Sequence, residues 1–318
     1  YVVVTLVGSL LILRGSLSVG VIFTFLLYMR NFSRPLNSLA TLFNTIQSAL
    51  AGAERVFEVI DEKPERDEMG AIPAENLRGD VTAQAVSFAY DSAQQVLKNA
   101  SFEVKAGETI AIVGPTGAGK TTIISLLNRF YDPTEGSITI DGVDIRHFTR
   151  DSLRREIGLV LQDTFLFSES IADNIRYGRL EATDEEVIRA AKMADAHGFI
   201  MQMEKGYETV LSDNGQNLSQ GQRQLLAIAR AILSDPALLI LDEATSSIDT
   251  RTEQIIQASL LKLMQGRTSF VIAHRLSTIQ HADQILVVKD GAIIERGTHQ
   301  TLLAQNGFYT TLYNSQFA

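Results

Sequence analysis

The sequence contains no cysteine in 318 residues, and its basic residues are fewer than its acidic ones. The lack of cysteine excludes disulfide bonds and thiolate metal sites. The 28 lysines and arginines stand against 37 aspartates and glutamates, which gives a net charge of −9. Because a nucleic-acid partner requires a basic surface that neutralises phosphates, this balance argues against DNA or RNA binding.

The sequence also lacks an initiator Met and a charged signal-peptide region before its first apolar run, Tyr1–Leu13. This uncharged run is shorter than the ~20 residues that span a bilayer. We interpret it as the cut end of a longer helix, and a buried core helix is the alternative. The first expectation is therefore that the chain begins inside a larger protein.

A second apolar segment starts at Leu17 and passes into a helical pattern without a clear stop signal. Apolar residues recur at helical spacing over 36–60, and the intervening face is largely polar. A helix over 18–61 would be about 65 Å long, twice the ~30 Å of a bilayer core. We expect it to enter the membrane, line a polar space and project beyond the bilayer. The depths of Arg30 and Arg34 stay open.

The composition divides the chain into three parts. Residues 1–60 form the expected all-α membrane part, and the charged, proline- and glycine-containing residues 61–77 are typical of a linker. Over 78–318, short strands alternate with helices, which predicts a layered α/β domain with a largely parallel sheet. The pairs Asp141-Gly142 and Asp290-Gly291 indicate hairpin turns that add antiparallel strands.

A glycine-rich loop, GPTGAGKTT, follows a predicted buried strand over 108–113 and precedes a helical run. This context is that of a P-loop, in which backbone N–H groups and a helix N-terminus surround phosphate oxygens. Lys120 would reach the outer phosphates, and Thr121 would offer its hydroxyl to Mg²⁺. A chance glycine-rich turn is the alternative. The predicted nucleotide-binding residues of this loop are Gly114, Thr116, Gly117, Gly119, Lys120, Thr121 and Thr122.

A fully apolar strand, 238–241, runs into Asp242 and Glu243. An acidic residue at the carboxyl edge of a parallel sheet lies where ligands bind. Asp242 is suited to hold Mg²⁺ through water, and Glu243 is suited to polarise an attacking water. Without a P-loop, the charged start of a helix would explain the pair equally well. Beside a P-loop, the pair indicates hydrolysis.

Ser219, Gly221 and Gln222 precede a second long helical run. Ser219 with Gln222 three residues later forms a capping box. A helix N-terminus that carries serine and glycine is also an anion site, and the two interpretations are compatible. Since the chain already has one phosphate cradle, a second one indicates contact with a nucleotide held by another molecule.

Taken together, these motifs make the domain resemble the nucleotide-binding domain of ATP-binding cassette (ABC) exporters, in the class of P-loop NTPases with antiparallel β and helical subdomains. The resemblance covers the whole chain and implies ATP and Mg²⁺ as cofactors. It also implies that Tyr1–Leu13 is the end of the fifth membrane helix and that the helix from Ser18 is the sixth and last. Each single motif is weak beyond the P-loop, whereas the ordered set is specific. The matching positions, in chain order, are Tyr90, 114–121, Gln162, 218–222, Asp242 with Glu243, 247–249 and His274.

The resemblance assigns roles that the residues alone do not. Tyr90 would stack on adenine, although a tyrosine on an edge strand is the alternative. Gln162 would contact Mg²⁺ and sense the membrane domain, and a polar loop residue is the alternative. His274 would contact the γ-phosphate and join Glu243 and Gln162 in catalysis, although a lone histidine at a strand end is usually structural. Asp249 would lie at a dimer interface.

Two departures from the family pattern concern the face offered to a partner. Gln220 stands where the usual LSGGQ signature has glycine, and 213–215 reads Asp-Asn-Gly where Glu-Arg-Gly is usual. Both resemble one half of heterodimeric multidrug-type exporters. An unequal pair is therefore favoured over a homodimer, with Ser219 and Gly221 contacting the γ-phosphate held by the other half.

The sequence thus predicts the ATP-hydrolysing subunit of an exporter that moves amphipathic drugs or lipids. The subunit would be integral to the plasma (inner) membrane, with a cytoplasmic nucleotide-binding domain and a second half-transporter as partner. A soluble ABC ATPase of DNA repair or translation is disfavoured by the apolar N-terminal region and the acidic charge. A regulatory half that does not hydrolyse ATP is disfavoured by the presence of Glu243 and His274.

Overall fold

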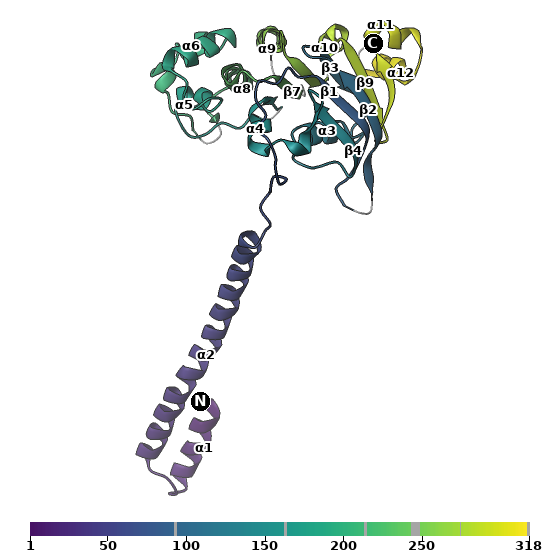
Figure 1. Ribbon diagram of the computed structural model, residues 1–318. Helices are drawn as coiled ribbons and strands as arrows, with labels where there is room; N and C mark the ends of the chain where they lie inside the picture. The colour runs from purple at the N-terminus through teal and green to yellow at the C-terminus, as the bar shows by residue number, and fades with distance from the viewer. Residues whose placement is uncertain (92–93, 162–163, 213–214, 243–248, 274, 317–318) are drawn as a thin grey trace. The chain divides into compact units, whose positions relative to one another are not determined.

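The computed structural model describes residues 1–318 except 92–93, 162–163, 213–214, 243–248, 274 and 317–318 (Figure 1). The predicted residues Gln162, Glu243 and His274 lie outside the described residues, as does the Asp213-Asn214 pair. The chain divides into two compact units, Tyr1–Arg66 and Asp67–Ala318.

The first unit consists of two helices, α1 (Val2–Leu13) and α2 (Val19–Ile60). The predicted helix over 18–61 is confirmed, because Ser18 is the N-cap and Asp61 the C-cap of the 42-residue α2. The two helices pack closely at Gly8, where a Cβ atom would lie 2.6 Å from Ile22 Cδ1.

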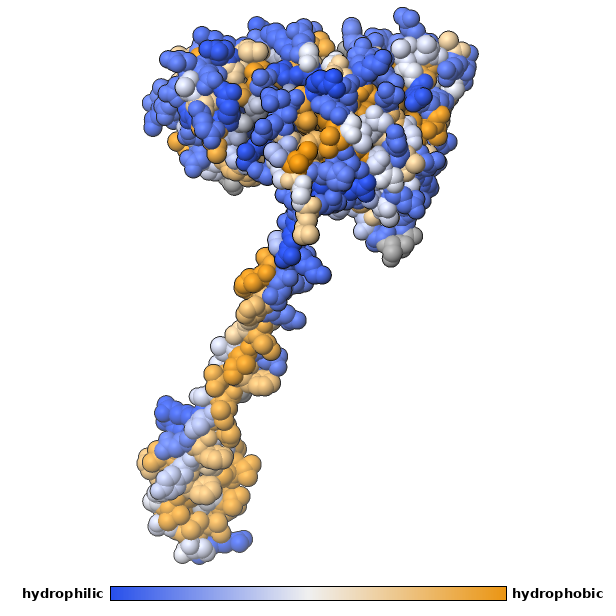
Figure 2. Space-filling view, viewed as in Figure 1, coloured by the Kyte–Doolittle hydropathy of each residue, from blue (hydrophilic) through white to orange (hydrophobic). Residues whose placement is uncertain are grey.

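The surface of the first unit is rich in apolar side chains. Figure 2 shows them over much of α1 and α2, and Leu6 and Phe23 are 62% and 74% exposed. Hydroxyls on α2 bond within the helix, as Thr41 Oγ1 donates to the carbonyl oxygen of Asn37 at 3.0 Å. Among the helices that the structure describes, none combines the length and the apolarity needed to cross a membrane.

The second unit contains a six-stranded sheet and a four-stranded sheet (Figure 1). The larger sheet has the order β10-β9-β3-β8-β7-β6, and every pair in it is parallel except β9 with β10. The smaller sheet has the order β2-β1-β4-β5 and is antiparallel. The predicted α/β domain with a largely parallel sheet is confirmed.

The strands of both sheets are short. Those of the larger sheet are β3 (Thr109–Val113), β6 (Ile157–Val160), β7 (Leu238–Asp242), β8 (Thr268–Ile272), β9 (Gln284–Lys289) and β10 (Ala292–Gly297). Those of the smaller sheet are β1 (Val81–Ala89), β2 (Gln95–Val104), β4 (Glu135–Ile140) and β5 (Val143–Asp144).

Both predicted Asp-Gly hairpin turns are present. Asp141 and Gly142 have φ of 51° and 82° between paired residues of β4 and β5. Asp290 and Gly291 have φ of 51° and 83° between paired residues of β9 and β10. Two consecutive positive φ values define a type I′ turn, whose twist matches that of the strands it joins.

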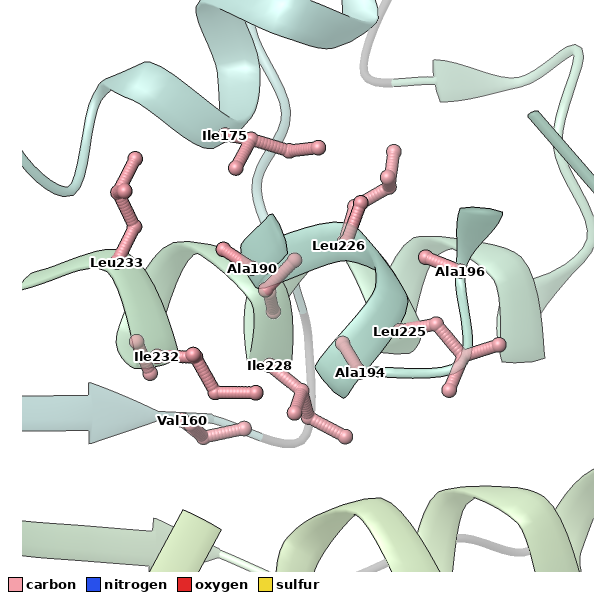
Figure 3. Packing of buried hydrophobic residues seen from close by; sticks show 14 of the residues in the cluster. Val160, Ile175, Ala190, Ala194, Ala196, Leu225, Leu226, Ile228, Ile232 and Leu233 are labelled. Atoms are coloured by element: carbon pink, nitrogen blue, oxygen red, sulfur yellow. The ribbon is translucent and has the colours of Figure 1, made fainter. Parts of the chain in front are cut away.

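Side-chain alternation on β7 shows how the larger sheet divides the core. Leu238 and Ile240 belong to a buried cluster shared with the smaller sheet and with α3 (Lys120–Leu127). Leu239 and Leu241 belong to a cluster on the opposite face. In that second cluster, α8 (Gln220–Ser234) packs against α5 (Ile171–Arg176), α6 (Asp184–Met193), α9 (Thr250–Met264) and β6. Figure 3 shows Ile228 and Ile232 of α8 beside Val160 of β6.

The remaining elements are short. They are η1 (Ile145–His147), α4 (Arg150–Arg155), α7 (His197–Ile200), η2 (Gly206–Glu208), α10 (Leu276–His281), α11 (His299–Ala304) and α12 (Phe308–Gln316). Glu295 of β10 accepts hydrogen bonds from the backbone N–H groups of Phe308 (2.6 Å) and Tyr309 (2.9 Å). These bonds fasten the start of α12 to the edge of the larger sheet.

Candidate active site

The sheet topology explains why the predicted site residues are scattered in the sequence. Strands β3, β8, β7 and β6 are adjacent and parallel, so their carboxyl ends lie along one edge of the sheet. Ligands of α/β proteins bind at this edge. The predicted residues Gly114, Asp242, Glu243, Gln162 and His274 each end one of these strands or follow it by one or two positions.

The loop after β3 has backbone conformations that require glycine. A Cβ atom on Gly114 would lie 2.1 Å from the carbonyl oxygen of Val288 in β9. Gly119 has φ of 107°, and a Cβ atom there would lie 3.3 Å from the carbonyl oxygen of Val96. The Asp290-Gly291 hairpin supports the loop from the side, because Gly291 N donates to the carbonyl oxygen of Ala118 at 3.1 Å. The neighbouring strands therefore hold the loop closely.

Lys120 is a buried cation, 9% exposed, at the start of α3. Its Nζ donates to the carbonyl oxygens of Gly114 (2.8 Å) and Pro115 (3.0 Å). Burial lowers the pKa of Lys120 from its ordinary value, and the charge of Asp242 partly opposes this effect. Because removing a charge from water is costly, an anion that reaches this ammonium group would be bound strongly.

The first turn of α3 is open to such an anion. Its N-cap is Gly119, which has no side chain to accept a hydrogen bond from the first backbone N–H groups. Thr121 is exposed on this turn, whereas Thr122 is buried. The N–H groups and the helix dipole thus point toward the position where a phosphate would complete the turn.

Tyr90 lies beside this turn. Its ring is half exposed, and its hydroxyl is 3.2 Å from Thr122 Oγ1. The ring makes edge contacts with Phe88 (4.9 Å between centroids) and Tyr131 (5.1 Å). Tyr131 was not among the residues predicted from the sequence, and its position just after the helical run that follows the P-loop is the signal that would have indicated it. The cluster fixes an exposed aromatic face close to the phosphate loop.

The donor set at this edge fits Mg²⁺. Thr121 supplies an exposed hydroxyl, and Asp242 supplies a carboxylate near enough to influence Lys120 electrostatically. Mg²⁺ prefers hard oxygen donors, usually one or two from protein together with substrate phosphates and water. Within the described part of the chain, no cluster of three or more His, Asp or Glu side chains is arranged for a metal. The site is therefore suited to an ion that arrives with a phosphate ligand.

The start of α8 is closed by its own side chains. Ser219 Oγ accepts from Gln222 N at 3.2 Å, and Ser219 N donates to Gln222 Oε1 at 2.9 Å, so the predicted capping box is confirmed. Ser219 is exposed and Gly221 is buried. Asp249 is the N-cap of α9, where a hydrogen bond from Thr252 N (3.0 Å) lowers the pKa of its carboxyl group. The observed partners of Ser219 and Asp249 are thus local ones.

Comparison with known proteins shows to which family the second unit belongs. Residues 97–246, which hold the loop, α3, α8 and β7, match the family model described as ABC transporter. The chain carries an ABC transporter ATP-binding domain. The resemblance inferred from the motifs is confirmed, and membership of this ABC family implies that the domain binds ATP and is an ATPase.

Relatives of this ABC domain extend the match to the first unit. The chain is 58% identical, over 318 residues, to an uncharacterized ABC transporter ATP-binding protein, YfiC, of Bacillus subtilis, covering all of this chain and 53% of that protein. It is 50% identical, over 309 residues, to a fatty acid ABC transporter ATP-binding/permease protein of Mycobacterium bovis, covering 97% of this chain and 49% of that protein.

A solved structure shares the fold of this ABC chain. It is described as a bacterial Atm1-family ABC exporter with ATP bound, and it aligns with a TM-score of 0.78 and 43% sequence identity. The alignment covers 95% of this chain and 53% of that one. The chain therefore spans about half the length of the proteins it matches.

Proposed function

We propose that this chain is the ATP-hydrolysing part of an ABC exporter that moves a lipid or another amphipathic molecule across a membrane. The observation that carries the proposal is the buried Lys120, bonded to two neutral carbonyl oxygens at the start of a helix whose N-cap is glycine. The transport part is supported by one relative, named as a fatty acid transporter and permease, and by the solved structure, which is that of an exporter.

The proposed reaction is phosphoryl transfer from ATP to water. Lys120 and the first N–H groups of α3 would hold the outer phosphates, and Tyr90 would stack on adenine. Thr121 and Asp242, with Gln162, would hold Mg²⁺, which supplies positive charge to the phosphates when bound. Glu243 would polarise the attacking water, and His274 would contact the γ-phosphate. Catalysis would rest on positioning and electrostatics.

The proposed partner is a second, unequal half-transporter. Ser219, Gly221, Gln222 and Asp249 would contact the nucleotide held by that partner. Gln220 is the first residue of α8, where the family pattern has a glycine, and a side chain at this position would alter the approach of a phosphate to the helix start. We propose accordingly that the ATP bound by this chain's P-loop is hydrolysed, while the one facing Ser219 turns over slowly.

The proposed location is the plasma (inner) membrane, with the second unit in the cytoplasm. The exposed apolar surface of α1 and α2 supports this proposal, since apolar patches of this kind are stable in contact with lipid or with other apolar helices. Residues 1–60 would then belong to the membrane domain of the transporter, and residues 61–77 would connect it to the ABC domain over 78–318.

Glu243→Gln in the full-length protein tests the catalytic part. Hydrolysis should slow by about 10²–10⁴-fold, the usual contribution of a positioned base, while ATP still binds. Phosphate release in lipid vesicles, with and without a long-chain fatty acid such as oleate, measures both turnover and its stimulation. A collapse of ATP affinity together with the rate would show that Glu243 is structural. Absence of hydrolysis in the unmodified protein would refute the proposed function.

A further inference from the structure

The segment that opens the second unit, residues 67–74, is hydrogen-bonded along its length and is called the strap here. Asp67 Oδ1 accepts from Arg150 N at 2.9 Å. Ile72 N donates to the carbonyl oxygen of His147 at 2.8 Å, and Ile72 O accepts from Thr149 N at 2.9 Å. Ala74 N donates to Ser152 Oγ at 2.8 Å. The strap is thus paired with the loop between η1 and α4 on both sides of Phe148.

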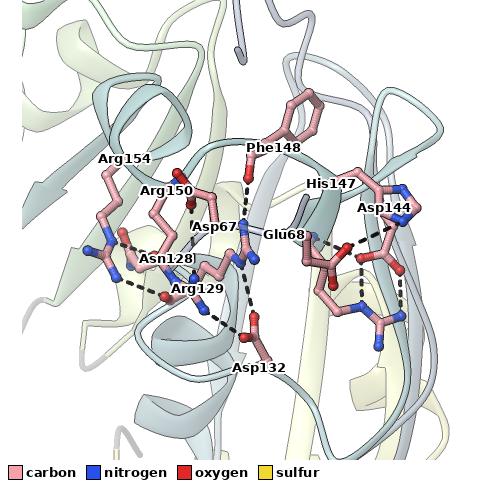
Figure 4. Close-up of polar contacts among 11 residues, drawn as sticks. Asp67, Glu68, Asn128, Arg129, Asp132, Asp144, His147, Phe148, Arg150 and Arg154 are labelled. Atoms are coloured by element: carbon pink, nitrogen blue, oxygen red, sulfur yellow. Dashed lines mark hydrogen bonds and ion pairs between the residues drawn. The ribbon is translucent and has the colours of Figure 1, made fainter. Parts of the chain in front are cut away.

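That loop is in turn tied to the end of the P-loop helix. Arg150 Nη2 donates to Asp132 Oδ2 at 2.7 Å, and Asp132 Oδ1 accepts from Arg129 Nε at 3.0 Å (Figure 4). Arg129 also donates to the carbonyl oxygen of Phe148 at 2.5 Å. Asp132 therefore bridges two arginines, one at the start of α4 and one just after the end of α3.

Arg129 is fixed unusually firmly for an arginine. It is 1% exposed and has φ of 51°, the left-handed conformation that ends many helices. Arg154 Nη2 donates to the carbonyl oxygen of Arg129 at 2.9 Å, and Arg154 Nε donates to that of Asn128 at 3.3 Å. Two guanidinium groups thus hold the end of α3, where the helix dipole favours positive charge.

The length of α3 makes this anchoring relevant to the phosphate loop. The helix has eight residues, which corresponds to about 12 Å at 1.5 Å per residue. Lys120 and Thr121 lie at its first turn and Arg129 lies just beyond its last. A two-turn helix packed in a core moves as one body, so a shift of its end is also a shift of the groups that face the phosphates.

We propose that the strap and the hydrogen-bonded chain Asp67–Arg150–Asp132–Arg129 form a mechanical connection through which the segment preceding Asp67 and the P-loop helix influence each other. The inference rests on the proposed function. Arg66 and Asp67 are consecutive residues, and they are the last residue of one unit and the first of the other. A displacement of α2 that reaches Asp67 is passed through these hydrogen bonds to α3, and nucleotide binding at α3 is passed back, since coupling is reciprocal.

The test uses the full-length protein in lipid vesicles. The 318 residues contain no cysteine, and any cysteine outside them is first replaced with serine. A single reporter, Asn44→Cys on α2, is labelled with a water-soluble maleimide with and without ATP. The expected result is a labelling rate that changes on ATP binding in the reporter protein. In Asp67→Ala and in Arg150→Ala this change is lost, while a fluorescent ATP analogue still binds.

Two matched variants control for damage to α4 and for loss of charge. Asp151→Ala breaks the exposed Asp151–Arg155 pair on the same helix, which does not belong to the chain of contacts, and it retains the ATP-dependent change. Asp67→Asn keeps an oxygen that accepts from Arg150 N, and it also retains the change.

The possible outcomes distinguish a failure of the proposed connection from a failure of the proposed function. An ATP-dependent change that survives in Asp67→Ala, or a reporter protein in which ATP binds without altering labelling, contradicts the connection. Equal loss of ATP binding and of the labelling change in Asp67→Ala, with a lowered melting temperature, shows that the strap is only structural. A reporter protein that binds no ATP refutes the proposed function itself and this inference with it.

Discussion

Two helix starts in the second unit, those of α3 and α8, are completed in different ways. The N-cap of α3 is Gly119, and the nearby charge is the buried Lys120, bonded to neutral carbonyl oxygens. The N-cap of α8 is Ser219, whose hydroxyl and backbone N–H are both paired with Gln222. The first start has no side-chain cap and leaves its first N–H groups open to a ligand, whereas the second has a capping partner of its own.

This difference shows how the same structural feature, a helix N-terminus, can serve either ligand binding or the stability of the fold. A helix N-terminus has orphan N–H groups that must be satisfied. When a side chain satisfies them, the helix gains stability and an anion has to compete for the site. When the N-cap is glycine, the N–H groups stay open, and a cation buried beside them lowers the stability of the fold. The same arrangement raises the affinity for an anion. We therefore expect mutations at the two starts to separate nucleotide binding from folding.

The largest expected effect is at α3. Lys120→Ala should abolish nucleotide binding or turnover, because the mutation removes the buried charge that we propose binds the outer phosphates. Titration with a fluorescent ATP analogue and phosphate release by the full-length protein measure the two losses. Ser219→Ala serves as the matched change at α8 and should leave binding to this chain's own P-loop intact. Near-normal ATPase activity of Lys120→Ala would overturn the P-loop assignment.

A smaller loss is expected from Gly119→Ala. The alanine would have to adopt φ of 107° with its Cβ 3.3 Å from the carbonyl oxygen of Val96. Strain of this kind costs of order 1–3 kcal/mol, which is roughly 5- to 150-fold in ATP affinity if the loop relaxes to relieve it. Gly107→Ala is the control, since its φ is 81° and no atom lies within 4 Å of the added Cβ. Equal affinities for the two variants would contradict a role of Gly119 in shaping the loop.

The contrast between the two helix starts was largely visible in the sequence, because each depends on neighbouring residues. The P-loop glycines and the Ser219–Gln222 box lie within one turn, and local chemistry decides their structure. The bounds of α2 and both Asp-Gly hairpins followed from periodicity and turn preference in the same way. Such features require no knowledge of what packs against them.

The features that the sequence did not reveal depend on contacts between distant segments. Residues 61–77 have the composition of a linker, yet the strap within them is paired with residues 147–152. Arg129 has the sequence context of a surface residue after a helix, and its burial results from Asp132 and Phe148. The orientation of Tyr131 toward Tyr90 likewise depends on distant segments, because the ring of Tyr131 contacts those of Phe88 on β1 and of Tyr90.

Ser219→Ala gives a third prediction, now on stability. Loss of the N-cap hydroxyl should lower the free energy of unfolding by ~1 kcal/mol, because Gln222 N loses its acceptor. Urea denaturation of the full-length protein measures the change. Ser219→Asp keeps an acceptor at the cap and should lose less. An Ala variant that weakened ATP binding to this chain's own P-loop as much as it weakened the fold would remove the distinction between the two helix starts.

The smallest expected effect concerns the cost of burying Lys120, and Lys120→Met tests it. Burial lowers the pKa of Lys120 below its ordinary 10.5, so the unfolded chain binds the proton more tightly than the folded chain does. Between the two pKa values the unfolded state holds more protons, and stability therefore rises with pH in that window. At neutral pH the buried charge of Lys120 therefore lowers the stability of the nucleotide-free protein. Lys120→Met should thus be slightly more stable than the unmodified protein there.

The pH dependence distinguishes this explanation from a simple gain in apolar packing. The advantage of Lys120→Met should be constant at neutral pH and should shrink as the pH rises through the lowered pKa toward 10.5. Tyr309, whose pKa burial raises to about 12, lowers the stability of both proteins equally above pH 10 and cancels in the difference. Thermal unfolding of the two proteins at a series of pH values measures the gap, with Lys105→Met as an exposed control. If the stability difference between Lys120→Met and the unmodified protein stayed constant to high pH, it would be explained by apolar packing and not by removal of a buried charge.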